Sequence, residues 1–244
     1  MNQLVDYAFE DGVARITMDD GKLNVMSLAM LAALDGAFDR AARDEAVVLL
    51  SSGRERIFSA GFDLKVFAAG DDQAGQAMVK AGAELALKVL THPGPVLSVC
   101  AGHAYPMGAF LILASDVRLG VDGPWRIGLN EVAIGIPVPS FALEIARQRL
   151  IPSYLNRTAV TGEMFAPAEA VTAGFLDCVV APDEAEDVVA ATLAALKAVH
   201  RPSHITTKRR LRETSAQAVR TAIDRELTRE AYRQRPAANV RLPA

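Results

Sequence analysis

The chain has few of the residues that mark secreted, metal-binding or membrane-spanning proteins. It contains 2 cysteines and 1 tryptophan in 244 residues, and it shows neither paired cysteines nor the histidine and glutamate spacing of a zinc site. Cys100 and Cys178 both lie within apolar stretches, where a thiol usually packs as a small hydrophobic group. The sequence therefore predicts neither a disulfide framework nor a metal site.

Charge of one sign and long apolar runs are also scarce. The formal net charge is −3 and the pI is near 5.8, so a general nucleic-acid binder is not expected. No uncharged run reaches the roughly 18 residues of a membrane span, and the N-terminus has acids where a signal peptide has basic residues. We expect a folded cytoplasmic protein that binds no membrane. The charge is uneven, because residues 201–244 carry eleven Lys and Arg against four Asp and Glu.

Strand and helix patterns alternate along the first part of the chain. Apolar residues alternate with polar ones on both sides of Asp11-Gly12, which predicts a β-hairpin. Ser27 is suited to cap a helix, because apolar residues then recur at helical spacing from Leu28 to Ala41. The further expected elements are buried strands at 46–50 and 95–100, a loop at 58–64 and helices at 72–91 and 141–149.

The last part of the chain is helical in pattern. Helices are predicted at 183–198, 206–213 and 215–233, with no strand among them. The fold class is therefore α/β, with a mixed core over 1–195 and a helical region over 196–244. No linker rich in Gly and Ser separates them, so we expect the two parts to pack together.

Three segments differ from plain core sequence. In residues 58–64, small residues follow a strand and allow backbone to approach a ligand closely, although a simple turn also explains them. Residues 101–110 run from a strand end into a helix, whose free N–H groups suit a developing oxyanion. In residues 125–136, Glu131 lies among apolar neighbours, and burial there would raise its pKa toward that of a useful base, whereas an exposed loop glutamate is the alternative.

Together and in this order, the motifs resemble the enoyl-CoA hydratase/isomerase family, also called the crotonase superfamily. The resemblance rests on stretches that read KLNVMS (22–27), FSAGFDL (58–64), AGHAYPMGAF (101–110), IGLNEVAIG (127–135) and TGEMFAPAEAVTAGFLD (161–177). It implies a spiral of ββα repeats with a helical C-terminal trimerisation region, assembled as a homotrimer or a dimer of trimers.

The resemblance also implies chemistry on an acyl-CoA thioester. Members of the family hold the thioester enolate with two backbone N–H groups, which by position fall on Phe62 and Met107. The loop that contacts CoA falls on Ala60, Gly61, Asp63 and Leu64, and Asp63 alone also suits a turn-stabilising acceptor. Coenzyme A is expected as part of the substrate, with no permanently bound cofactor. The usual Gly-Gly-Gly run is here Pro106-Met107-Gly108.

The acids of the site decide the reaction that the resemblance implies. Hydratases of the family use two glutamates to hold and activate water, and the first of these positions is Phe110 in this chain. The second glutamate is Glu131. A single glutamate with an apolar first position looks like the Δ3,Δ2-enoyl-CoA isomerase branch, in which Glu131 would move a proton from C2 to C4 of a 3-enoyl thioester.

Other residues have two interpretations each. Tyr105, Gly108, Phe110 and Trp125 could line the acyl pocket, and packing explains Tyr105 and Trp125 equally well. His103 more often makes a structural hydrogen bond than a catalytic one at such a place, and Glu144 could replace the missing acid or face solvent.

The basic residues near the C-terminus are also open to two interpretations. Lys208 and Arg209 could bind CoA phosphates, or they could belong to a solvated helix face.

Three functions stay open on the sequence alone. The first is the isomerase. The second is an enoyl-CoA hydratase or another reaction of the family, such as thioester hydrolysis, which needs a second polar group. The third is a degenerate scaffold that only binds CoA, against which the retained Glu131 argues.

Overall fold

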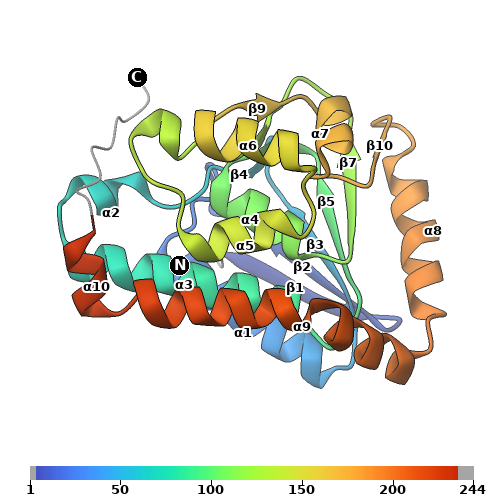
Figure 1. Cartoon of the computed structure of the whole chain (residues 1–244). Coiled ribbons are helices and arrows are strands. Elements are labelled where there is room, and N and C mark those ends of the chain that lie inside the picture. Colours follow the sequence, from blue (N-terminus) through green and yellow to red (C-terminus); the bar gives the residue numbers. More distant parts are fainter. Residues whose placement is uncertain (1–3, 236–244) are drawn as a thin grey trace.

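The computed structural model describes residues 4–235, which form two β-sheets covered by helices (Figure 1). The strands are β1 (Val5–Glu10), β2 (Val13–Met18), β3 (Val47–Ser52), β4 (Arg56–Ser59), β5 (Val96–Cys100), β6 (Gly102–Ala104), β7 (Val117–Val121), β8 (Ile127–Gly128), β9 (Met164–Phe165) and β10 (Cys178–Val180). The helices are α1 (Leu28–Arg43), α2 (Leu64–Ala68), α3 (Asp72–Leu90), α4 (Pro106–Ala114), the 3₁₀ turn η1 (Val132–Ile134), α5 (Ser140–Arg147), α6 (Pro152–Thr161), α7 (Pro167–Ala173), α8 (Ala185–Lys197), α9 (Arg201–Glu226) and α10 (Arg229–Gln234).

The larger sheet has the strand order β1-β2-β3-β5-β7-β10. The predicted hairpin is confirmed, with β1 antiparallel to β2 and Glu10 opposite Val13 across the Asp11-Gly12 turn. All the other pairs in this sheet are parallel. The predicted cap of α1 is confirmed as well, because the Ser27 hydroxyl accepts the Met30 N–H at 3.2 Å.

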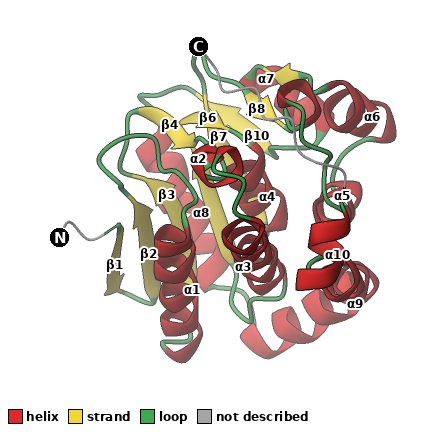
Figure 2. Cartoon of the chain, turned by 90° about the vertical axis from the view of Figure 1, so that its left-hand side faces the viewer, coloured by secondary structure: helices red, strands yellow, loops and turns green. Residues whose placement is uncertain are grey.

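Alternate residues of this sheet enter two separate cores. On β3, Val48 and Leu50 join the main core with α1, α3 and α4, whereas Val47 and Leu49 face the opposite side, where α8 packs. This is the alternation expected of a strand that is buried on both faces. In Figure 1, β5 and β7 accordingly lie between α4 and α8, and in Figure 2 α8 is seen behind the strands.

The smaller sheet has the strand order β4-β6-β8-β9. β4, β6 and β8 run parallel, and β9 is antiparallel to β8. The prediction of a loop over 58–64 is therefore wrong at both ends, because Phe58 and Ser59 belong to β4 and Leu64 begins α2. The loop itself is only four residues long, which fixes it closely between the strand and the helix.

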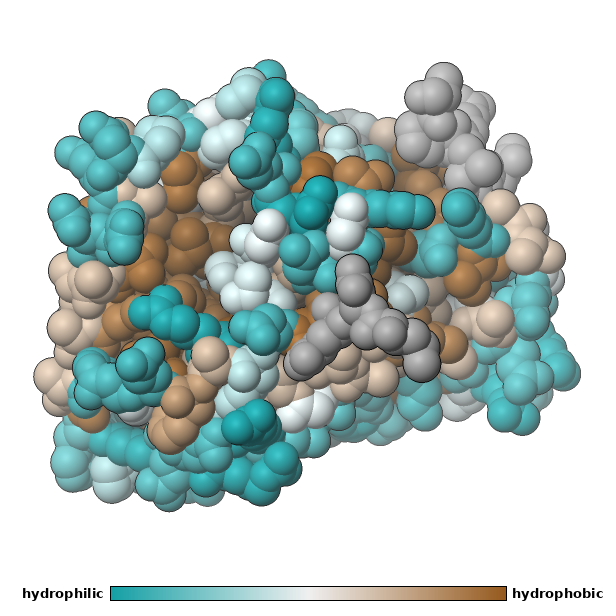
Figure 3. All heavy atoms as spheres, turned by 180° about the vertical axis from the view of Figure 1, so that it is seen from behind, coloured by the Kyte–Doolittle hydropathy of each residue, from teal (hydrophilic) through white to brown (hydrophobic). Residues whose placement is uncertain are grey.

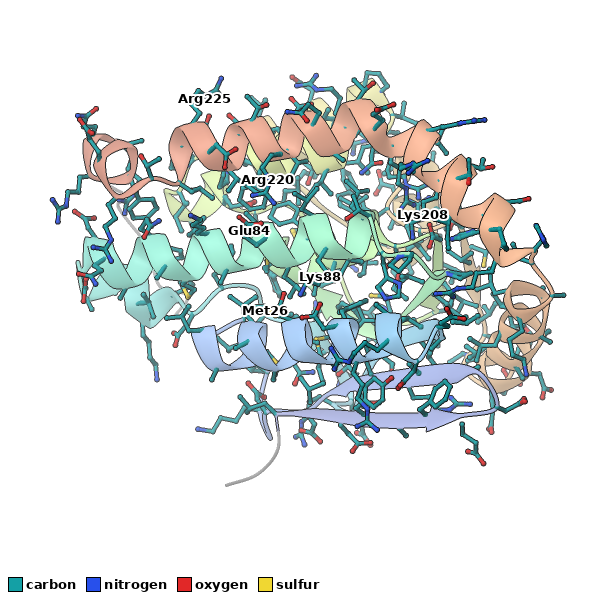
Figure 4. All side chains as sticks on the ribbon, turned by 90° about the horizontal axis from the view of Figure 1, so that it is seen from below. Met26, Glu84, Lys88, Lys208, Arg220 and Arg225 are labelled. Atoms are coloured by element: carbon teal, nitrogen blue, oxygen red, sulfur yellow. The ribbon has the colours of Figure 1, made fainter. Side chains whose placement is uncertain are left out.

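The C-terminal region is helical as predicted, but its division is different. Helix α9 runs without interruption from Arg201 to Glu226, so the expected break near residue 214 is wrong. Packing against α3 and α5 supports the helix through Thr214 and Ser215, whose intrinsic helix preference is weak. In Figure 4, Arg220 of α9 points to Glu84 of α3, and the pair forms two hydrogen bonds of 2.7 Å each.

The surface is mixed in character. Seen from behind, hydrophilic side chains are interspersed with apolar areas (Figure 3). Within the described residues, no helix has both the length and the apolar character needed to cross a membrane.

Candidate active site

The smaller sheet brings the three motif segments to one edge. Its three parallel strands are aligned so that Ser59 pairs with Ala104 and Ala104 pairs with Ile127. Phe62, Met107 and Glu131 each follow these residues by three or four positions. All three therefore lie beyond the carboxyl ends of adjacent parallel strands, the usual position of a binding site in sheets of this kind.

In the loop after β4, the Phe62 N–H points away from the neighbouring segment at Met26. Met26 N–H donates to the Gly61 carbonyl at 2.8 Å. That carbonyl and the Phe62 N–H belong to one trans peptide and point in opposite directions. The Phe62 N–H is therefore directed away from Met26, and the turn requires Gly61 at φ +82°, which a side chain would disfavour.

Buried polar contacts fix this loop from below. The Ser59 hydroxyl donates to the Asn24 carbonyl at 2.7 Å and accepts the Gly61 N–H at 3.1 Å. The Asn24 amide in turn donates to the Phe58 carbonyl at 3.2 Å. Sequence reasoning missed both side chains as supports of the site, and the only available signal was their place in the quoted motifs.

The second backbone donor is at the start of α4. Pro106 is the first residue of this helix and Met107 the second, so the Met107 N–H lies in the first turn and has no partner within the helix. The Phe62 ring and the Met107 sulfur both lie against Gly82 of α3. A Cβ on Gly82 would be 2.6 Å from the ring and 3.0 Å from the sulfur. The two donor segments are thus packed together.

Glu131 is a buried carboxylic acid that has no charged partner within residues 4–235. Its residue is 7% exposed, and its Oε2 atom has no hydrogen-bond partner among the described residues. Burial raises the pKa of Glu131 to about 8, with a hydrogen bond from its own backbone opposing the shift. A carboxyl group with a pKa near neutrality and a free oxygen can both take up and return a proton.

On helix α4, an apolar side chain stands where a second acid would lie. Phe110 lies one turn beyond Met107, is 1% exposed and packs edge-on against Phe141 of α5, with ring centroids 5.9 Å apart. Gly108 has a packing role, because a Cβ there would lie 2.8 Å from the Ser59 Cβ. Glu144, the other candidate acid, lies 3.7 Å from Arg147 in an ion pair on α5.

His103 and Tyr105 stack on each other at the end of β6, with ring centroids 6.0 Å apart. The Nδ1 atom of His103 accepts the Arg126 N–H at 3.1 Å, which is the structural hydrogen bond that the sequence favoured. Burial, Arg126 and Arg56 lower the pKa of His103. Tyr105 also lies close to Gly61, because a Cβ on Gly61 would be 3.5 Å from the Tyr105 Cβ.

The position of Trp125 corrects the predicted acyl pocket. Its indole N–H donates to the Val121 carbonyl at 2.9 Å, and its ring belongs to the core beneath α8 together with Leu193. Met107 and Phe110 belong to the other core. Trp125 therefore packs on the α8 side of the larger sheet, and the alternative of simple packing is the one that fits.

The position of Lys208 corrects the predicted phosphate site. Its ammonium group is buried and lies 2.7 Å from Asp116, whose second oxygen is 2.9 Å from Arg212. Burial lowers the pKa of Lys208 to about 8. Figure 4 shows Lys208 on the inner side of α9. Because the Lys208 ammonium group is already bound by Asp116, this group is not available to a CoA phosphate. Arg209 is exposed, and its contact with a CoA phosphate stays a prediction.

The loop that was predicted to contact CoA has structural contacts of its own. The Asp63 carboxylate caps α2 by accepting the Lys65 N–H at 3.0 Å, as expected of a turn acceptor. Ala60 N–H donates to the Leu23 carbonyl at 2.9 Å. A contact between CoA and Ala60, Gly61, Asp63 or Leu64 stays a prediction. Among residues 4–235 no group of His, Cys, Asp and Glu is arranged to hold a metal ion.

The comparisons with known proteins show the family and the fold of the chain. The family model described as enoyl-CoA hydratase/isomerase matches residues 8–236. The chain belongs to the enoyl-CoA hydratase/isomerase family. A family member from Pseudomonas syringae has a solved structure that is 40% identical, with a TM-score of 0.88 over 92% of this chain and 96% of that one. The α/β architecture with its helical C-terminal region is therefore the crotonase fold.

Other members of the family differ in the reaction for which they are named. The structure of an enoyl-CoA hydratase from Mycobacterium ulcerans is 35% identical, with a TM-score of 0.88 over 94% of this chain and 99% of that one. The human mitochondrial enoyl-CoA delta isomerase 1 is 27% identical over 219 residues, which is 88% of this chain and 72% of the relative. The chain is thus similar to both isomerases and hydratases.

Proposed function

We propose that the protein isomerises a 3-enoyl-CoA to a 2-enoyl-CoA, with Glu131 as the single group that carries the proton. Two features together carry this proposal. The buried carboxyl group of Glu131 has a free oxygen, and on α4 the residue one turn after Met107 is Phe110 rather than an acid. A hydratase needs a hydrogen-bonding group that orients water, and the side chain of phenylalanine has no such group.

The proposed reaction begins with ionised Glu131, which removes a proton from C2 of the substrate. The electron pair of the broken C–H bond delocalises into a dienolate, whose negative charge falls on the thioester oxygen. The N–H groups of Phe62 and Met107 stabilise that oxygen, and one such donor is typically worth about 3 to 4 kcal/mol. Glu131 then returns the proton at C4, so that the double bond moves into conjugation and the carboxylate is restored.

The apolar surroundings support this role in two ways. Burial raises the pKa of Glu131 to about 8, which brings it closer to the weakly acidic C2–H than an exposed carboxylate would be. Phe110, which is buried one turn after Met107, carries no group that could hold water for exchange with the transferred proton. Coenzyme A enters this scheme as part of the substrate, and a homotrimer or dimer of trimers is the expected assembly, to be measured by light scattering.

Hydration is the second candidate, because a relative that is 35% identical is named an enoyl-CoA hydratase. A paired assay separates the two reactions. Purified protein is given a 3-enoyl-CoA in one cuvette and a 2-enoyl-CoA in the other, with Glu131→Gln as the control. A gain of the conjugated absorbance from the first substrate, lost in the variant, is the expected result. Loss of conjugation from the second substrate would instead establish hydration.

A further inference from the structure

The segment that carries Glu131 is flanked along its length by residues 158–165. On β8 and β9, Ile127 pairs with Phe165 and Gly128 pairs with Met164. The regular ladder then ends, and the next backbone donor, the Leu129 N–H, is bound by the hydroxyl of Thr158 at 2.8 Å. A side chain of α6 therefore continues the strand pairing for one more residue toward Glu131.

The hydroxyl group of Thr158 both accepts and donates a hydrogen bond. Thr158 is completely buried, and its Oγ1 also donates to the Glu163 carbonyl at 2.9 Å. It thus joins the strand before Glu131 to the turn that leads into β9. Valine has nearly the same shape as threonine, but it would leave the Leu129 N–H and the Glu163 carbonyl unpaired.

The end of α6 holds the other side of Glu131. Gly162 ends this helix at φ +75° and lies against Ala133, two residues after Glu131. A Cβ on Gly162 would be 2.8 Å from the Ala133 Cβ and 3.0 Å from its nitrogen. Among the described residues Oε2 of Glu131 has no partner, and the backbone of Glu131 itself bonds to the carboxyl group, so the direction of this group depends on how that backbone is held.

The charged groups on α6 and in the segments after it are engaged with one another. Arg157 donates to Glu163 at 2.7 Å and to Glu169 at 3.1 Å, and its guanidinium group lies over the Tyr154 ring. These three charged side chains are about 40% exposed. Removing the Thr158 hydroxyl changes none of these charges. An effect of this substitution on Glu131 would therefore come from a displacement of the Glu131 side chain.

We propose that Thr158 is a positioning residue for Glu131, whose hydroxyl fixes Leu129 and so directs the carboxyl group toward the substrate carbon. This inference rests on the proposed role of Glu131 as the proton carrier. Thr158 itself does not contact the reacting atoms. The loop needs this support because β8 is only two residues long and Glu131 lies beyond its end.

The test compares Thr158→Val with Thr158→Ser, which keeps the hydroxyl. Thr161→Val is the matched control, because Thr161 lies on the same helix and its hydroxyl bonds only to Arg157 within that helix. Thr158→Val should lower kcat at least tenfold with KM changed less than twofold, while Thr158→Ser and Thr161→Val stay within about threefold of wild type. Gly162→Ala disturbs the same loop from the other side without leaving a polar group unpaired, and it should reproduce the loss of kcat.

A second readout is independent of turnover. The titration of the Glu131 carboxyl carbon, followed by ¹³C NMR and assigned with Glu131→Gln, should move below its wild-type midpoint in Thr158→Val and not in Thr161→Val. Wild-type kcat together with an unchanged titration in Thr158→Val would overturn the proposal, as would a loss of kcat that Thr158→Ser shares. If the wild-type protein hydrates a 2-enoyl-CoA instead, the proposed isomerase fails, and the same kcat comparison on that substrate still decides the role of Thr158.

Discussion

Burial of Glu131 should make the folded protein less stable as the pH rises, and Glu131→Gln should remove that dependence. The pKa is about 8 in the folded protein against 4.5 for an ordinary glutamate, so between these values the folded state binds the extra proton. The contribution of Glu131 is therefore fully favourable below pH 4.5 and is lost as the pH rises through 8. At 1.36 kcal/mol for each pH unit, the loss between pH 5 and 9 is about 4 kcal/mol as an upper bound.

The assay is guanidinium unfolding at pH 5, 7 and 9 at one fixed protein concentration. Glu131→Gln should gain stability relative to wild type as the pH rises, by several kcal/mol between the two ends of the range, even though it should lose its activity. Glu144→Gln, which removes a half-exposed carboxylate on α5, controls for the change in net charge. A stability difference between Glu131→Gln and wild type that is the same at all three pH values would refute the reasoning.

Three further outcomes are expected. Asp116→Ala leaves two buried cations of α9 without their carboxylate and should lower the free energy of unfolding by about 3 to 5 kcal/mol, and unchanged denaturation would contradict this account of the cluster. Gly82→Ala brings a methyl group against Phe62 and Met107, so kcat/KM should fall and overpacking should cost about 1 to 3 kcal/mol in a melting experiment. Trp125→Phe should lower Tm and leave the preference for acyl chain length unchanged, because Trp125 packs beneath α8, and an altered preference would place it in the pocket after all.

Local sequence signals were enough to predict turns and helix caps, which depend on the residues at the turn or cap itself. The turn at Asp11-Gly12 and the cap at Ser27 depend on residues within a few positions, and both are confirmed. The continuous α9 was not predictable in this way. Thr214 and Ser215 favour a break locally, and only the packing of α9 against α3 and α5, residues far away in the sequence, keeps the helix intact.

The candidate site was likewise predictable only where local motifs mark its residues. The motifs predicted Phe62, Met107 and Glu131 as site residues. The pairing of β4, β6 and β8 places all three at one edge, and their roles stay predictions. Trp125 and Lys208 were misinterpreted because their partners, the α8 core and Asp116, are set by the tertiary fold. An aromatic or basic residue next to a motif gives no sign of which face of its element is buried.

The proposed proton transfer from C2 to C4 is the step that tests the proposed role of Glu131 most directly. A 3-enoyl-CoA deuterated at C2 is converted in ordinary water, and the position of the label in the 2-enoyl product is read by mass spectrometry and NMR. A single buried carboxyl group that is screened from water should deliver part of the deuterium to C4. A wild-type product that carries no deuterium at C4 would contradict the account, and so would an undiminished rate in Glu131→Gln.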